Sequence, residues 1–433
     1  MAGIQDHPHR YTLANELHAR PFPMVQAPCQ VAYMAIKPER DAARRDRALD
    51  RAHLLALLDR HGAGHPGAGA THHSVAIGRD MLKWESHTEF VTYTAIRPGL
   101  TAPAFDPAVS SVFPEDWLAQ APGRRVTSIQ MQIDWMPDSD AALDALLTDW
   151  FEAESVAAGT VLDGAAVVAS DFRIDPSGHM RVALFVKKGS GPRRVGRIVQ
   201  RMCEIETYKA MSMLGLVRAR ALSAKMGALD LKLSEMTDAM TRPGNSAEAT
   251  LSELLAVAAE LEQMVVQSSF RFGATRAYEA IVNERIAVLR EGRLLGRQTL
   301  AEFMARRYDP AMRTVKASEE RLNALAERAM RAGTLLGTRV DVERSSQNQK
   351  LLESMDRRAD LQLRLQKTVE GLSVVAISYY AVQLLAGLMR PLAEPAGLSA
   401  TVVTALVTPP VVLIVWALIR RLRKELSSGE GGK

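Results

Sequence analysis

Two uncharged apolar runs near the C-terminus constrain this chain more than any other feature. They cover residues 371–389 and 398–419, and the short link 390–397 separates them. A helix needs about 20 predominantly apolar residues to cross the hydrocarbon core of a bilayer, and both runs approach that length. The alternative is a buried soluble hairpin, but a soluble core helix normally keeps a polar face. From Thr401 onward the second run has only threonines as polar residues, which favours a transmembrane hairpin.

Basic residues flank the hairpin on one side. They are Arg357, Arg358, Arg364 and Lys367 before the first run, and Arg420, Arg421, Arg423 and Lys424 after the second, whereas the link has one Arg and one Glu. Lys and Arg accumulate on the cytoplasmic side of short flanks. We therefore expect a multi-pass protein of the inner (cytoplasmic) membrane, with the lipid bilayer as a partner, both termini in the cytoplasm and the link outside.

The composition indicates that most of the chain is soluble. A length of 433 residues predicts two or three structural units, and 24% of the residues are charged. The net charge of +5 comes from arginines interleaved with acidic residues, and aromatic residues are only 5%, so we expect no nucleic-acid partner. Cys29 and Cys203 lie far apart in no metal-like spacing, which suits a reducing compartment without disulfides. The first ten residues contain no apolar signal-peptide segment.

Alternating strand and helix patterns predict a soluble α+β domain at residues 1–190. The predicted strands cover residues 29–37, 74–79, 81–86, 88–97, 125–134, 165–174 and 179–187, and the predicted helices cover 39–60, 114–119 and 139–157. Two strand–helix–hairpin passages of similar layout suggest a duplicated unit.

Residues 191–367 are predicted to form a long-helix or coiled region. A helix of about fifty residues begins at Pro192, a second begins near 245, and shorter ones cover 274–290 and 297–307. The last begins near Met312 and continues into the first apolar run without a linker. Apolar stripes along these helices predict helix-on-helix packing, within the chain or between subunits. Residues 368–433 then form the hairpin with its basic cytoplasmic tail.

Small and polar side chains recur on one face of each predicted membrane helix. Ser373, Ala376, Tyr380, Gln383 and Gly387 follow steps of i, i+3, i+7, i+10 and i+14 in the first run, and Thr401, Thr404 and Thr408 share a face of the second. Polar groups at membrane depth cost free energy unless they find partners or water. These faces are therefore predicted either to line a pore or to pack helix against helix.

The N-terminal string contains a second polar cluster. Its members are His7, Arg10, Asn15, Glu16, His18 and Arg20, and Pro21 follows them. Such a cluster could contact an anion or a metal, but the spacing dictates no reaction. We favour a role in holding an N-terminal arm against the domain. The sequence contains no phosphate-binding Walker loop, no nucleophile elbow and no paired-cysteine site, so we expect no enzyme and no cofactor, with a divalent cation left open.

The string His7-Pro8-x-Arg10-x-x-Leu13-x-Asn15-Glu16-x-His18-Ala19-Arg20-Pro21, the length and the hairpin together resemble a family of bacterial membrane-anchored proteins of unknown function. The order of the parts also resembles CorA-type divalent-cation channels. That resemblance implies a homo-oligomer, with the first membrane helix lining its axis. Where those channels carry Gly-Met-Asn, this chain has Gly387-Leu388-Met389-Arg390.

Three functional hypotheses follow from these observations. The first is an oligomeric, CorA-like ion channel or transporter with a large cytoplasmic domain. The second is a membrane-anchored scaffold or sensor whose cytoplasmic domain binds a protein or a small ligand. The third, an enzyme, rests only on the N-terminal cluster.

The hairpin hypothesis predicts how the protein behaves in isolated membranes. The full chain should stay in the membrane pellet after a carbonate wash, because apolar helices in the bilayer are not released by high pH or salt. A cysteine placed in the link, at Ala393, should react with an impermeant maleimide from outside the cell, and one placed at Ser428 should not. Release by carbonate, or labelling of the two positions in the reverse order, would contradict the predicted topology.

Overall fold

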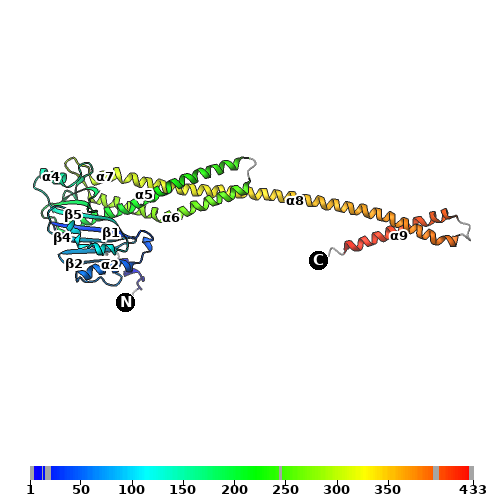
Figure 1. Cartoon of the computed structure of the whole chain (residues 1–433), viewed down its shortest axis with the longest axis horizontal. Coiled ribbons are helices and arrows are strands. Elements are labelled where there is room, and N and C mark those ends of the chain that lie inside the picture. The colour runs from blue at the N-terminus through cyan, green and yellow to red at the C-terminus, as the bar shows by residue number, and fades with distance from the viewer. Residues whose placement is uncertain (1–3, 12, 15–20, 243–245, 394–398, 429–433) are drawn as a thin grey trace. The chain divides into compact units, whose positions relative to one another are not determined.

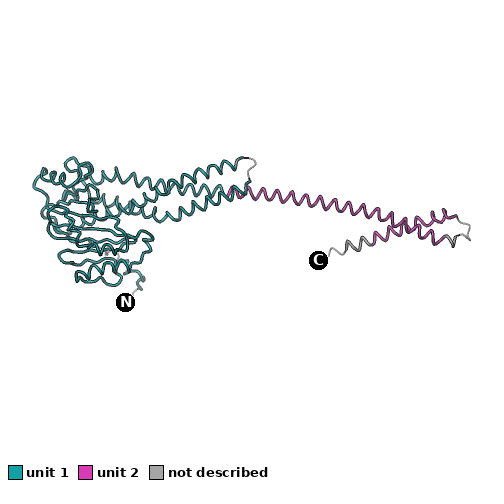
Figure 2. The backbone as a smooth tube through the Cα atoms, viewed as in Figure 1, with its two compact units in different colours: residues 1–333 teal, residues 334–433 magenta. Residues whose placement is uncertain are grey.

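The computed structural model describes residues 4–11, 13, 14, 21–242, 246–393 and 399–428. It divides the chain into two compact units, Met1–Gly333 and Thr334–Lys433 (Figure 2). The first unit contains a mixed β-sheet with helices, and the second contains most of the helix Asp309–Ala393 and all of the helix Ala400–Ser428. The predicted α+β fold class, with long helices after the sheet, is confirmed; the predicted three-part division stays a prediction.

The sheet of the first unit has nine strands. They are β1 (Cys29–Lys37), β2 (His72–Ile77), β3 (Asp80–Ser86), β4 (Val91–Pro98), β5 (Arg124–Trp135), β6 (Ala157–Val161), β7 (Ala166–Ile174), β8 (Met180–Val186) and β9 (Gly292–Arg293). Their order is β2-β3-β4-β1-β5-β8-β7-β6-β9, and β5–β8 is the parallel pair. The halves β2-β3-β4-β1 and β6-β7-β8-β5 repeat one strand order, as the duplicated layout predicts. The two halves differ in the direction of one strand. β1 pairs antiparallel with β4, whereas the equivalent strand β5 pairs parallel with β8.

Helices cover both faces of this sheet (Figure 1). The helical elements are η1 (Ala42–Arg44), α2 (Arg47–Arg60), η2 (Pro107–Val112), α3 (Glu115–Ala119), α4 (Asp140–Trp150), α5 (Pro192–Thr241), α6 (Ala247–Leu289), α7 (Leu300–Arg307), α8 (Asp309–Ala393) and α9 (Ala400–Ser428). Successive residues of β1 point to opposite faces of the sheet and therefore pack against different helices. Val31 and Tyr33 pack in the cluster that contains α5, whereas Ala32 and Met34 pack against α2 and α3. Helix α4 covers the second half on the same face as α2.

Burial of apolar side chains holds these layers together. In α2, Leu54, Leu57 and Leu58 recur at i, i+3 and i+4 and are fully buried against the sheet. Each such side chain contributes about 1.5–3 kcal/mol when it leaves water. The apolar face of α2 therefore holds this helix against the sheet.

Three predicted helix boundaries were wrong. The helix predicted at 39–60 is interrupted, because Asp46 caps α2 by accepting a hydrogen bond from the backbone N–H of Ala48. The helix predicted at 139–157 ends at Trp150, and the short strand β6 follows it. The helices predicted on either side of residue 274 form the single helix α6.

Helices α5 and α6 pack closely, and the first part of α8 joins them in the first unit. A Cβ atom added at Gly215 would lie 2.3 Å from Thr275 Oγ1, so this glycine permits the close approach of α5 and α6. Ser212 Oγ lies 2.8 Å from Tyr308 Oη at the start of α8. Arg328 of α8 forms an ion pair of 3.2 Å with Asp230 of α5. The predicted packing of helix on helix is confirmed here.

The chain before β1 lies against the start of α5. Val25 N–H donates to the carbonyl oxygen of Pro192 at 3.1 Å. An added Cβ at Gly196 would lie only 1.7 Å from the carbonyl oxygen of Pro23. The glycine at this position therefore allows the segment of Pro23 and Val25 to reach the helix surface.

This close approach predicts opposite effects of alanine at two glycines of α5. Gly196→Ala should lower the free energy of unfolding by about 1–3 kcal/mol, because the methyl group displaces Pro23. Gly227→Ala should raise it by about 0.5–1 kcal/mol, because alanine favours the helix and no atom lies within 4 Å. Denaturant unfolding of the full chain in detergent measures both. Equal changes in the two variants would contradict the tight contact at Gly196.

Candidate functional site

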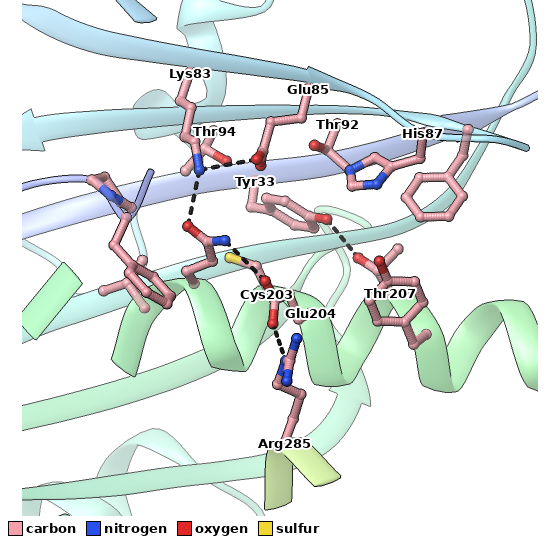
Figure 3. Close-up of a pocket in the computed structure, with 16 residues that line it drawn as sticks. Tyr33, Lys83, Glu85, His87, Thr92, Thr94, Cys203, Glu204, Thr207 and Arg285 are labelled. Carbon is pink, nitrogen blue, oxygen red and sulfur yellow. Dashed lines mark hydrogen bonds and ion pairs between the residues drawn. The ribbon is translucent and has the colours of Figure 1, made fainter. Parts of the chain in front are cut away.

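A polar cavity lies between the first half of the sheet and α5, and we call it the sheet–α5 cavity (Figure 3). Its volume is about 380 Å³. Strands β1, β3 and β4 form one wall and α5 forms the opposite wall, while Arg285 of α6 and the segment of Phe22 and Pro23 complete it. All of these elements belong to the first unit.

Regular periodicity directs the lining side chains into this cavity. Lys83 and Glu85 are two residues apart in β3 and therefore point to the same face of the sheet. Thr92 and Thr94 do the same in the neighbouring strand β4. The α5 wall is made by residues at helical spacing, which are Val199, Gln200, Cys203, Glu204, Thr207 and Tyr208.

A chain of polar contacts crosses the cavity from the sheet to α6. Lys83 Nζ lies 3.1 Å from Glu85 Oε1 and donates to Gln200 Oε1 at 2.9 Å. Gln200 Nε2 in turn donates to Glu204 Oε1 at 2.9 Å. Arg285 Nε donates to Glu204 Oε2 at 2.5 Å. Side chains of alternating charge from β3, α5 and α6 thus form one connected network, which Figure 3 shows.

The sheet end of this network is deeply buried. The side chains of Lys83 and Glu85 are 4% and 10% exposed. Removing one member of a buried ion pair leaves the other charge without compensation and costs about 3–5 kcal/mol. The sheet wall of the cavity is therefore polar, and its two charges are held in place by each other.

Two further titratable groups of the cavity, Cys203 and Tyr33, stay protonated. Burial raises the pKa of the Cys203 thiol well above its ordinary value, and the charge of Glu204 raises it further. Burial also raises the pKa of Tyr33, whose hydroxyl lies 2.5 Å from Thr207 Oγ1. A thiol that stays protonated is a poor nucleophile. The geometry therefore suits hydrogen bonding and ion pairing to a ligand.

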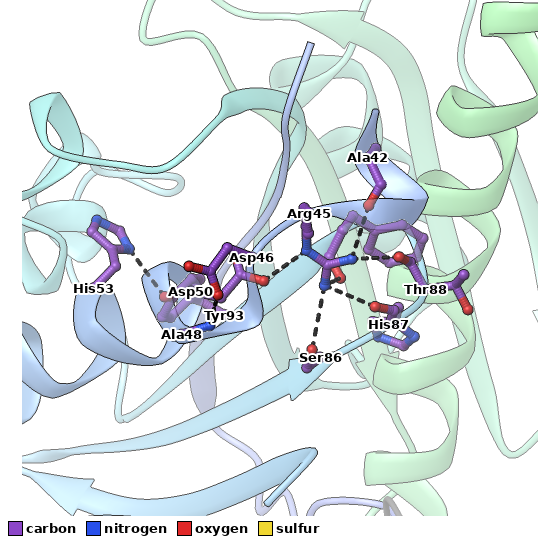
Figure 4. Close-up of polar contacts among 11 residues, drawn as sticks. Ala42, Arg45, Asp46, Ala48, Asp50, His53, Ser86, His87, Thr88 and Tyr93 are labelled. Atoms are coloured by element: carbon purple, nitrogen blue, oxygen red, sulfur yellow. Dashed lines mark hydrogen bonds and ion pairs between the residues drawn. The ribbon is translucent and has the colours of Figure 1, made fainter. Parts of the chain in front are cut away.

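Arg45 holds the turn between β3 and β4 that borders the cavity (Figure 4). Its side chain is buried and pairs with Asp50 at 2.6 Å. The guanidinium also donates to the carbonyl oxygens of His87 at 2.8 Å and Phe90 at 3.1 Å. Since His87 and Phe90 line the cavity, Arg45 fixes the position of this wall.

Glu89, in the same turn, connects the sheet to α6. Its side chain is buried and forms an ion pair with Arg271. It also accepts a hydrogen bond of 2.8 Å from the hydroxyl of Tyr278. The ring of Tyr278 stacks on Tyr208, which lines the cavity, with 5.4 Å between ring centroids. Two buried ion pairs, Arg45–Asp50 and Arg271–Glu89, therefore hold the turn that borders the cavity.

The residues predicted in the membrane helices lie in the second unit. The hydroxyls of Ser373, Thr404 and Thr408 each donate to the carbonyl oxygen four residues earlier in their own helix, at 2.9, 2.9 and 2.7 Å. Tyr380 is 68% exposed, and Gln383, Gly387 and Thr401 are exposed as well. Hydrogen bonds within their own helix therefore satisfy the hydroxyls of three predicted residues, Ser373, Thr404 and Thr408.

The most buried residues of the two membrane-helix candidates are not the predicted ones. Ser378 and Val382 of α8 are buried, as are Val403 and Val411 of α9. The predicted face of α8 at Tyr380, Gln383 and Gly387 is thus not covered by α9. Thr404 and Thr408 are half-buried, on the side of α9 that also contains Val403 and Val411.

The N-terminal cluster is only partly described. His7 and Arg10 are exposed, and Arg10 pairs with Asp6 four residues earlier. Asn15, Glu16, His18 and Arg20 lie outside the described residues. Among the residues that the structure describes, no group of three or more His, Cys, Asp or Glu side chains could hold a metal ion.

Sequence reasoning missed the sheet–α5 cavity. Its charged members, Lys83, Glu85, Glu204 and Arg285, come from three segments that are far apart in the chain. One local signal was available, because β3 places Lys83 and Glu85 on a single face of a strand that is buried on both faces. Charges at such positions require partners from the element that covers the strand.

The fold and these sites define an α+β protein that ends in two helices long and apolar enough to cross a membrane. The apolar segments lie in α8, before Met389, and in Ala400–Arg421 of α9, with mean hydropathies of 1.8 and 2.4. The chain belongs to the DUF3422 family, described as proteins of unknown function, whose family model matches residues 5–426. No curated protein and no solved structure matches the chain.

Proposed function

We propose that the protein is a membrane-anchored sensor whose α+β domain binds a small zwitterionic molecule in the sheet–α5 cavity. The observation that carries this proposal is the network of alternating charges within the cavity. A volume of about 380 Å³ falls within the range of about 300–1,000 Å³ that is usual for small-molecule sites. The two apolar helices of the second unit supply the membrane anchor.

The charges of the cavity set the class of ligand. Lys83 and Arg285 can bind a carboxylate, and Glu85 and Glu204 can bind an ammonium group. The four formal charges cancel, so a ligand with only one sign of charge would leave an excess charge in a buried site. The rings of Tyr33, Phe90 and Tyr208 add apolar walls for the body of the ligand.

Helix α5 connects the cavity with the helical bundle of the first unit. Glu204 of α5 meets the ligand site, and Asp230, about seven turns further along the same helix, pairs with Arg321 and Arg328 of α8. A ligand that draws Glu204 away from Arg285 would change the packing of α5 on α6. The proposed signal therefore passes along α5 and α6 to the helix that enters the membrane.

Ligand binding predicts thermal stabilisation that depends on Arg285. Glycine betaine and the proteinogenic amino acids should be screened with the full chain in detergent, with uncharged sugars as controls. A bound zwitterion at about 100 times its Kd adds about 2.7 kcal/mol to the free energy of unfolding. Arg285→Met should abolish this gain, whereas Arg276→Met, on the exposed part of the same helix, should retain it.

Two results would contradict the proposed sensor. One is that no zwitterion stabilises the wild-type chain. The other is that Arg285→Met keeps the same stabilisation as Arg276→Met, which would place the ligand elsewhere.

A second candidate function is an ion channel, and one observation supports it. The face of α8 at Tyr380, Gln383 and Gly387 is uncharged, contains polar groups and is not covered by α9. Such a face suits the lining of a water-filled path between several copies of the chain. The likeness to CorA-type channels is one of element order, and it adds no residue-level support.

The channel hypothesis predicts cation flux through the full chain in liposomes. Gln383→Leu should reduce this flux, because it removes a polar group from the proposed lining. Leu384→Ala, at the next residue, should leave it unchanged. No flux above that of empty liposomes with several monovalent and divalent cations would remove the channel hypothesis and leave the sensor.

A further inference from the structure

The part of α8 that precedes the membrane segment is exposed on all sides. Every residue from 341 to 369 is solvent-exposed in the second unit. This stretch contains eight large apolar side chains that are each more than half exposed, namely Val342, Leu351, Leu352, Met355, Leu361, Leu363, Leu365 and Val369. A soluble helix does not normally leave so much apolar surface in water, so another surface must cover it.

The uncharged face of the membrane segment continues through this exposed stretch. From Ser373 towards the N-terminus, the same alternating steps of four and three residues reach Val369, Gln366, Gln362, Ala359, Met355 and Leu352. These are the a and d positions of a heptad repeat, with Leu352 at a. One seam without a charged residue therefore extends from Leu352 to Gly387, across the predicted membrane boundary.

Charged residues occupy the other positions of the repeat. Arg357 and Arg364 fall at f, opposite the seam, and Glu353, Asp360 and Lys367 fall at b. The stretch contains many charged residues, yet none of them falls at position a or d. One face of the helix is therefore uncharged. A helix with this pattern suits a coiled coil.

We propose that this seam is the interface between copies of the chain, which pair in parallel and in register along residues 352–387. Membrane insertion gives every copy the same direction, so the seam of one copy meets the same residues of another. Gln362 and Gln366 then lie beside their own equivalents, where amide groups can hydrogen-bond to each other. The proposal does not depend on the sheet–α5 cavity.

The positions that flank the seam are compatible with this register. In a parallel coiled coil, a g residue lies across from the e residue five positions later in the next helix. Arg358 then lies across from Leu363 of the second copy, and Leu365 lies across from its Glu370. No like charges meet. Polar layers such as Gln362 and Gln366 lower the stability of the interface and fix its register.

Disulfide trapping in native membranes tests the interface with the full chain. Ala359→Cys and Gln366→Cys place a thiol on the seam, and Arg357→Cys and Arg364→Cys place one two residues away, at f. The natural Cys29 and Cys203 are buried, so the unchanged chain serves as background. After mild oxidation, the seam variants should give at least about fivefold more covalent dimer, because disulfides need Cα atoms within about 7 Å.

Three results would overturn the proposal. The first is equal dimer yield at the seam and at f, and the second is no dimer at either seam position. The third is a covalent product whose mass is not a multiple of the chain mass, since that would assign the seam to a different protein. Because all four positions are exposed, none of the substitutions removes a core contact. Light scattering in detergent gives an independent check, and a monomeric wild-type chain would also contradict the interface.

Discussion

The need to pair buried charges between the sheet, α5 and α6 is the constraint on which the first unit depends. Lys83, Glu85 and Glu89 are all on or beside β3, and each is buried. A buried charge without a partner costs several kcal/mol, so each needs a compensating group at a fixed position. Lys83 pairs with Glu85 and donates to Gln200 of α5, whereas Arg271 of α6 pairs with Glu89. Arg285 of α6 pairs with Glu204 of α5. The position of α6 over the sheet is thus set by electrostatics as well as by apolar packing.

The second unit is held together by different interactions. Helix α8 exposes apolar side chains to solvent between residues 341 and 369. Helix α9 covers only part of the predicted membrane segment that follows. In lipid, hydrophobic burial does not hold helices together, and packing and polar contacts must do so. The uncharged seam on α8 offers both kinds of contact to further copies of the chain. The proposed ligand binding in the sheet domain and the proposed assembly along α8 are therefore compatible within one protein.

Much of the fold could be predicted from local patterns. Short runs rich in apolar and β-branched residues at 29–37 and 165–174 located β1 and β7, and Pro192 marked the start of α5. The strand β6 was missed, because Ala157-Ala158-Gly159 has no alternation and little β propensity. Its place in the sheet depends on pairing with β7 and β9, which are distant in the sequence. Likewise, α2 begins only after the cap at Asp46, and the preceding Arg45 contacts a turn some forty residues later in the chain.

The sequence by itself determined the features that depend on composition and period. These are the two apolar runs, the basic flanks, the alternating strands and the heptad seam, all of which a segment carries regardless of its surroundings. Only the tertiary structure decided that Lys83, Glu204 and Arg285 meet in one cavity, and that the Tyr380 face of α8 stays uncovered by α9. The physical reason is that charge pairing and burial depend on which distant segments pack together. The periodicity of a single segment does not show which other segments will pack against it.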